Sequence, residues 1–169
     1  MTTPTIRVAF SAWPHFNSQL RDAVSRLTDE QLARQPAPDR WPMWATFGHI
    51  ACQRVFGLCD AANEPGADTT PFTNAAFDCP GDDDLEHVLG VRELVDALDS
   101  TFAIVEERLD RWTFDMLPEE IRHPGWGADA VYTRGGIVQR AFAHDVSHAT
   151  ELNEMLGRWQ LPQMALWDW

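Results

Sequence analysis

Three histidines occupy positions from which they could bind one metal ion together. His144 and His148, in the run HDVSHATEL, are four residues apart, and residues four apart on an α-helix lie on one face. His49, in the run GHIA, belongs to an earlier predicted helix. Imidazole nitrogens are common ligands of zinc and other divalent transition metals. The spacing therefore predicts two ligands on the later helix and a third on the earlier one.

Both predicted helices carry their histidines on apolar stripes. The stripe that contains His144 and His148 also includes Ile137, Ala141, Leu152 and Met155. The stripe that contains His49 also includes Ala45, Cys52, Phe56 and Cys59. A single histidine on such a stripe is more often a core residue with a hydrogen-bond partner. Three of them favour a metal, because one divalent cation satisfies three buried ring nitrogens together.

A site with three protein ligands leaves coordination positions open, whereas structural zinc sites usually have four protein ligands. Water or a substrate thiol could occupy an open position, and the ion would lower the pKa of either one. Zinc and nickel are the expected metals for nitrogen ligands, with iron, cobalt and copper as alternatives. Cys52, three residues after His49, could be a fourth ligand, but a small buried core residue is the preferred interpretation.

Three further residues lie near His144 on the same predicted helix. Glu151, within ~20° of the His144 direction, is a candidate to orient metal-bound water or accept its proton, and a surface ion-pair partner is the equal alternative. Arg140, at about −40°, could hold a carboxylate or a thiol cofactor, although a solvated arginine is the preferred alternative. Asp145 points ~100° away and is expected either to support the ligands or to face solvent.

The elements that must position these residues are predicted to be helices, and the sequence contains no pattern of repeated strands. Apolar periodicity predicts long helices at 11–27, 42–61, 84–110 and 134–156. Thr28 and Gln31 form a capping-box pattern that opens a further short helix. Thr133 is the expected N-cap of the last helix, and Gly157 its expected stop. The fold class is therefore predicted to be all-α.

Two long loops, 62–83 and 112–133, separate these helices, and loops of this length are often functional. The second loop carries Trp112, Trp126 and Tyr132, which could line a pocket. Trp41 and Trp44 could do the same, and packing in the core or in a dimer explains them equally well.

The composition limits the partners and the compartment. A net charge of −13, no lysine and thirteen scattered arginines argue against nucleic-acid and anionic-membrane binding. No apolar run reaches the ~18 residues of a membrane span, and no signal pattern begins the chain, so we expect a cytoplasmic protein.

The length suits one domain, 1–169, with a core that needs no disulfide. Cys52 and Cys59, seven residues apart on one helix, cannot bridge.

The runs LTDEQLARQPAPDRWPMWATFGHIA and RGGIVQRAFAHDVSHATEL resemble the DinB/YfiT-like superfamily of proposed metalloenzymes. The matching features are Leu-Thr-Asp-Glu-Gln at the end of the first helix, Trp41 before the second, GHIA within it and the late His-x-x-x-His. The resemblance implies a four-helix bundle, up-down-down-up, with a long crossover between helices 2 and 3, and a homodimer. It implies His49, His144 and His148 as the metal ligands. It also implies a low-molecular-weight thiol, because the better-defined members use mycothiol or bacillithiol in S-transfer or isomerisation.

The sequence thus supports two hypotheses of different classes. In the first, the protein is a metal-dependent enzyme of the thiol-dependent S-transferase or hydrolase type, which acts on a small molecule through a metal-bound thiolate or water. In the second, it is a non-catalytic metal-binding or stress-associated helical-bundle dimer. A zinc protease is disfavoured, because HDVSH carries aspartate where the HExxH motif has its glutamate base.

Overall fold

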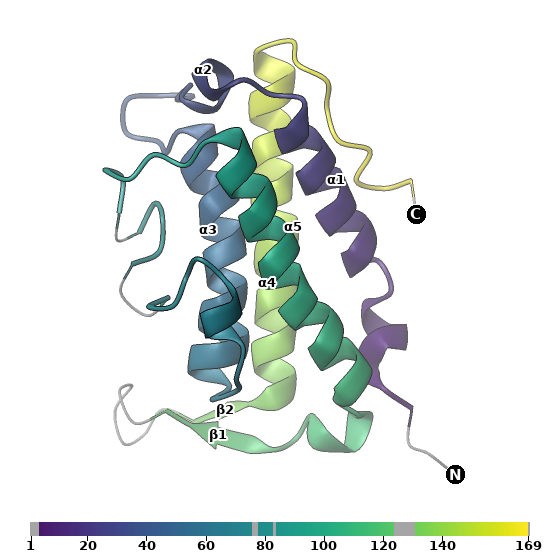
Figure 1. The fold of residues 1–169 in the computed structure, drawn as a ribbon. Coiled ribbons are helices and arrows are strands. Elements are labelled where there is room, and N and C mark those ends of the chain that lie inside the picture. The colour runs from purple at the N-terminus through teal and green to yellow at the C-terminus, as the bar shows by residue number, and fades with distance from the viewer. Residues whose placement is uncertain (1–3, 76–77, 83, 124–130, 169) are drawn as a thin grey trace.

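A computed structural model describes residues 4–75, 78–82, 84–123 and 131–168. Within these residues the chain is mostly helical, with five α-helices and one small sheet. Four helices are long and pack beside one another (Figure 1): α1 (Trp13–Ser25), α3 (Met43–Val55), α4 (Val91–Arg111) and α5 (Arg134–Arg158). The fifth, α2 (Asp29–Leu32), is short and precedes α3. Three 3₁₀ turns, Ile6–Phe10, Ala67–Thr69 and Phe114–Met116, complete the helical structure together with a π-helical segment, Phe56–Ala61.

The helix ends follow local capping chemistry at two predicted positions. The hydroxyl of Thr28 accepts a hydrogen bond from the backbone N–H of Gln31, and the Gln31 side chain accepts one from the backbone of Thr28. The hydroxyl of Thr133 accepts one from the backbone N–H of Gly136 and caps α5. Both predicted caps are therefore confirmed. The π-helical segment continues α3, so that together they span most of the predicted helix at 42–61.

The predicted start of the third long helix at residue 84 is wrong, because α4 begins at Val91. The Asp84 carboxylate accepts hydrogen bonds from the backbone N–H groups of Glu86 and His87, and this local turn competes with a helix. Val88, which extends the apolar spacing in the sequence, is 61% exposed. The long segment between α3 and α4 is correspondingly longer than predicted.

Two other expectations are also corrected. Gly157 does not stop α5, which continues through it to Arg158, and the chain adopts a left-handed conformation at Gln160 instead. The segment before α5 contains an antiparallel strand pair, β1 (Glu120–Arg122) and β2 (Val131–Thr133). Strands of three residues are too short to show a reliable alternation in the sequence, although Val-Tyr-Thr is a favourable strand composition.

A buried ion pair lies where α1, α3 and α5 meet. The Nε of Arg54 donates to Oδ2 of Asp145 at 2.8 Å, and the two residues are 0% and 1% exposed. The indole N–H of Trp13 donates to the same carboxylate oxygen at 2.6 Å, and Arg54 also donates to Asn17 Oδ1 at 2.8 Å and to the carbonyl of Leu98 on α4 at 3.3 Å. The expectation that Asp145 supports the ligands or faces solvent is therefore wrong, because its carboxylate is committed to the core.

The first prediction concerns this pair. Arg54→Met should lower the free energy of unfolding by about 3–5 kcal/mol, because it leaves the Asp145 carboxylate buried without its cation. The double variant Arg54→Met/Asp145→Leu should recover part of that loss, since it removes both charges. Urea unfolding followed by circular dichroism measures both values. A double variant less stable than the single one would contradict the assignment of an ionised pair.

Candidate metal centre

The three predicted histidines come together between α3 and α5. One possible ligand atom from each of His49, His144 and His148 lies within 4.8 Å of the others. The Nε2 atoms of His49 and His144 are 3.0 Å apart, and the rings of His144 and His148 have centroids separated by 4.5 Å. His49 is 3% exposed, whereas the pair on α5 is half-buried. The predicted inward direction of all three is confirmed.

Hydrogen bonds define the ring orientation of two of these histidines. His49 Nδ1 lies 3.0 Å from the carbonyl oxygen of Pro80, and His148 Nδ1 lies 2.9 Å from Oε2 of Glu151. A carbonyl or a carboxylate only accepts, so Nδ1 is the donor in both rings. In their neutral forms both rings then present the lone pair of Nε2. This is the arrangement that outer partners commonly impose on histidines that bind metals.

His144 is held differently. Its Nδ1 is buried and has no hydrogen-bond partner among the described residues. Burial, together with the neighbouring imidazoles of His148 and His49, lowers the pKa of His144 to about 3. The ring is therefore neutral at neutral pH, as a metal ligand must be. Its orientation depends on packing against the other two rings.

These residues fit a divalent transition metal. Zinc–nitrogen bonds of 2.0–2.1 Å in a tetrahedral site place the ligand nitrogens about 3.4 Å apart. The Nε2 atoms of His49 and His144 are 3.0 Å apart, and one nitrogen from each of the three rings lies within 4.8 Å of the others. Among the described residues, the group that could hold an ion around these rings consists of the three histidines. A site of this composition retains open positions for another ligand.

Cys52 does not extend this group, because it forms a disulfide with Cys79, 27 residues later in the chain. The alternative of Cys52 as a fourth ligand is therefore wrong. Cys59 is the remaining free cysteine and is buried. Helical spacing shows only that Cys52 and Cys59 cannot form a disulfide with each other. It does not predict the Cys52–Cys79 bond, because the position of Cys79 depends on how the segment between α3 and α4 folds back.

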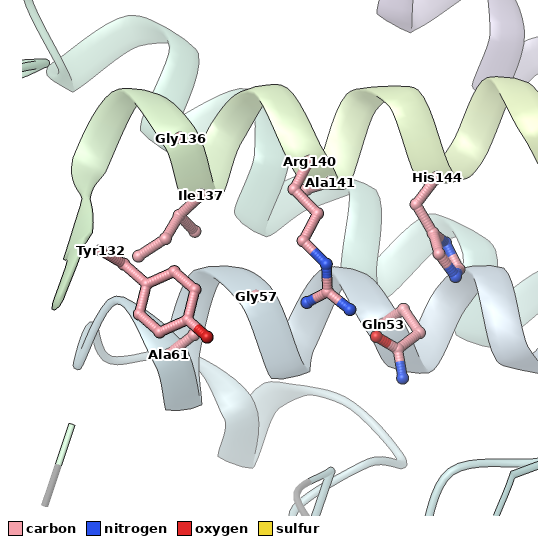
Figure 2. Close-up of a pocket in the computed structure, with 9 residues that line it drawn as sticks. All are labelled: Gln53, Gly57, Ala61, Tyr132, Gly136, Ile137, Arg140, Ala141 and His144. Carbon is pink, nitrogen blue, oxygen red and sulfur yellow. The ribbon is translucent and has the colours of Figure 1, made fainter. Parts of the chain in front are cut away.

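A small pocket of about 30 Å³ opens beside His144, as Figure 2 shows. Its walls come from α3, the π-helical segment, β2 and α5, and small side chains leave the space. Its lining consists of Gln53, Gly57, Ala61, Tyr132, Gly136, Ile137, Arg140, Ala141 and His144. Tyr132 lines it as predicted, whereas Trp112 is buried in the core. Trp126 lies outside the described residues. Gln53 has no feature in the sequence that singles it out.

Arg140 reaches this pocket from α5, near His144. Its guanidinium lies 6.0 Å from the centre of the Phe56 ring, and it forms no ion pair with a described residue. A cation without a paired carboxylate, beside an apolar wall, is a suitable partner for an anionic ligand group. Arg140 is thus well placed to bind an anionic group, and this role stays a prediction.

Trp41 packs directly against the histidines instead of lining the pocket. Its ring centroid is 4.8 Å from that of His49, and it stacks on His148 with centroids 6.2 Å apart. Trp44 is buried in the core. The Glu151 carboxylate, which holds His148, is about one-third exposed and can also reach solvent. Its predicted catalytic role is not tested by this contact.

The second prediction concerns the acid behaviour of the metal-free protein. Because the folded pKa of His144 is about 3 and the ordinary value is 6.5, the unfolded chain binds a proton in this range that the folded chain does not bind. The free energy of unfolding should therefore fall as the pH decreases from 6.5 towards 3. The slope should be about 1.4 kcal/mol per pH unit steeper than in His144→Gln. Chemical unfolding at several pH values with a chelator present measures it, and equal slopes would contradict a neutral, buried His144.

Comparisons with known proteins place this geometry in a family. No curated protein matches the chain. Among solved structures, a DinB-like protein from Bacillus cereus ATCC 10987 is similar, with a TM-score of 0.69, 16% identity, and coverage of 96% of this chain and 97% of that chain. At this identity the likeness shows the fold alone. The family model of the DinB superfamily matches residues 16–152, which include all three histidines. The chain therefore belongs to the DinB superfamily.

Proposed function

We propose that the protein is a metal-dependent enzyme that acts on a small molecule bound beside His144. The observation that carries the proposal is the convergence of three imidazoles, two with oriented Nδ1 donors, beside a pocket that His144 lines. A bound divalent ion, with zinc or nickel as the first candidates, supplies a positive centre that favours deprotonation of a thiol or of water. The reaction type proposed is thiol-dependent S-transfer or hydrolysis.

The chain's own residues have distinct parts in this proposal. His49, His144 and His148 hold the ion, and the Pro80 carbonyl orients the His49 ring. Glu151 orients His148, and its partly exposed carboxylate is the proposed acceptor of the proton that the thiol or water loses.

Arg140 is proposed to bind an anionic group of the substrate or of a low-molecular-weight thiol. The pocket that it lines with His144 lies next to the histidines and has a mainly apolar lining, so it would receive the reactive end of a small molecule. The small residues Gly57 and Ala61 on the opposite wall leave room for an apolar portion. A carboxylate on Arg140 would then orient the rest of the molecule towards the histidines.

Several broader features belong to the same proposal. We propose one domain over residues 1–169 with an up-down-down-up order of α1, α3, α4 and α5, supported by the long segment between α3 and α4 and by a single hydrophobic core. We also propose a homodimer in the cytoplasm, as the family resemblance and the sequence pattern suggest. The net charge of −13 supports the absence of a nucleic-acid or anionic-membrane partner. Among the described residues, no helix has the length and apolarity needed to cross a bilayer.

The third prediction tests the metal site. Protein purified without an affinity tag, and incubated with zinc or nickel, should contain close to one divalent ion per chain by elemental analysis. His144→Ala should lower the occupancy sharply, because one of three ligands is lost. His15→Ala, which changes a histidine on α1 whose Nε2 contacts the Ala165 carbonyl, should retain the ion. Less than about 0.1 ion per wild-type chain would contradict the proposed function.

The fourth prediction tests Arg140 with two probe thiols. N-acetylcysteine, which carries a carboxylate, should bind the zinc-loaded protein about 10-fold more tightly than N-acetylcysteamine, which lacks it. Arg140→Gln should remove this preference and leave the zinc content unchanged, as measured by calorimetry and elemental analysis. Arg158→Gln, on the same helix, is the control that should keep the preference, because Arg158 donates to the Pro36 carbonyl. A preference that survives in Arg140→Gln would exclude this residue as the anion partner.

Binding of zinc without turnover of any thiol-dependent reaction would favour the alternative, a non-catalytic metal-binding bundle. The pocket beside His144 argues for the enzyme, because an ion that only stabilises the fold needs no adjoining space.

A further inference from the structure

Residues 79–82, Cys-Pro-Gly-Asp, lie against His49 and form what we name the 79–82 segment. Pro80 accepts the hydrogen bond from His49 Nδ1 at 3.0 Å, and Asp82 Oδ2 lies 3.6 Å from the same nitrogen. Cys79 is joined to Cys52, which follows His49 by three residues on α3. The segment is therefore covalently attached to α3 within one helical turn of the histidine that it contacts.

Two glycines let the segment approach this closely. A Cβ atom at Gly48, the residue before His49, would lie 3.1 Å and 3.2 Å from Pro80 side-chain atoms and 2.9 Å from Leu89. Gly81 has a φ of +88°, and a Cβ there would lie 2.9 Å from the Trp41 ring. Trp41 in turn packs on the rings of His49 and His148. The segment thus supports one ligand by a hydrogen bond and two ligands through Trp41.

We propose that the Cys52–Cys79 disulfide holds the 79–82 segment as a positioning element for His49, so that opening the disulfide weakens metal binding at the three histidines. This inference rests on the proposed function, because its effect is on a proposed metal ligand. Without the bond, the segment is retained only by its noncovalent contacts, and the Pro80 carbonyl orients the ring during a smaller fraction of the time. Outer partners of a metal-bound histidine typically contribute about 10- to 100-fold in metal affinity.

The chemical step is a two-electron reduction. A dithiol reductant transfers two electrons and two protons, so that the S–S bond breaks, two cysteine thiols form and the reductant closes to its own disulfide. In a cytoplasmic protein the reducing pool supplies such dithiols, and structural disulfides are rare there. If the protein is cytoplasmic, as proposed, the bond can therefore be reduced in the cell, and its oxidation state would change the metal affinity of the three histidines.

The test compares zinc affinity in the two oxidation states of the full chain. A water-soluble phosphine opens the disulfide and becomes the phosphine oxide with oxygen from water. It is then removed by anaerobic desalting, before zinc is titrated against a chromophoric chelator. A thiol titration in denaturant should count one thiol before reduction and three after it. Reduced protein should bind zinc about 10- to 100-fold more weakly than oxidised protein.

Matched variants separate positioning from general stability. Cys52→Ser/Cys79→Ser should show the weaker affinity with or without the phosphine, whereas Cys59→Ser, which changes the free cysteine, should respond as the wild type does. Gly48→Ala keeps the disulfide and every histidine but displaces Pro80, so it should also weaken zinc binding. Its control is Gly157→Ala on α5, where the new Cβ meets only the end of the Gln163 side chain. Visible spectra of cobalt-loaded protein should change with reduction and in Gly48→Ala, which a loss of stability alone would not produce.

The outcomes are distinguishable. Three thiols before reduction, or equal zinc affinity and unchanged cobalt spectra in both oxidation states, would overturn this inference and leave the proposed function intact. If the double serine variant does not fold, Gly48→Ala carries the test, and unchanged zinc affinity in it would overturn the positioning role. Absence of zinc binding by oxidised wild-type protein would instead overturn the proposed function.

Discussion

The ion pair between Arg54 and Asp145 constrains how α1, α3 and α5 can pack. Removing two charges from water costs several kcal/mol per ion, and the cost is offset only where both groups are also hydrogen-bonded. Here Trp13 and Asn17 supply those contacts from α1. A rotation of any of the three helices about its axis would leave a buried charge or a buried indole N–H without its partner, so the pair selects one mutual orientation.

That orientation determines the metal site, because the ion pair and the histidines belong to the same two helices. Asp145 directly follows His144, and Arg54 comes five residues after His49, which is about one and a half turns. When α3 and α5 rotate so that Arg54 meets Asp145, His49 and His144 are brought to the neighbouring part of the same interface. The polar core and the candidate metal centre are thus two consequences of one packing arrangement.

The parts that the sequence predicts are those fixed by local periodicity. The inward direction of His49, His144 and His148 follows from helical spacing, and the caps at Thr28 and Thr133 follow from neighbouring side chains. The disulfide partner of Cys52 and the small-residue pocket depend instead on how distant segments meet. The sequence also carries a signal for the buried ion pair, because Arg54 lies on a helix that is apolar on nearly every side and therefore must be buried with a partner.

The three histidines differ in how firmly they are held, and this difference bears on where a ligand would act. His49 donates Nδ1 to the Pro80 carbonyl, His148 donates Nδ1 to the Glu151 carboxylate, and Trp41 packs on both rings. His144 has no such acceptor among the described residues, and it alone of the three lines the pocket with Arg140. In the proposed enzyme, His144 is therefore the ligand that a molecule in the pocket would contact. His49 does not line the pocket, and its ring is supported by the segment that contains Pro80, which does not line the pocket either.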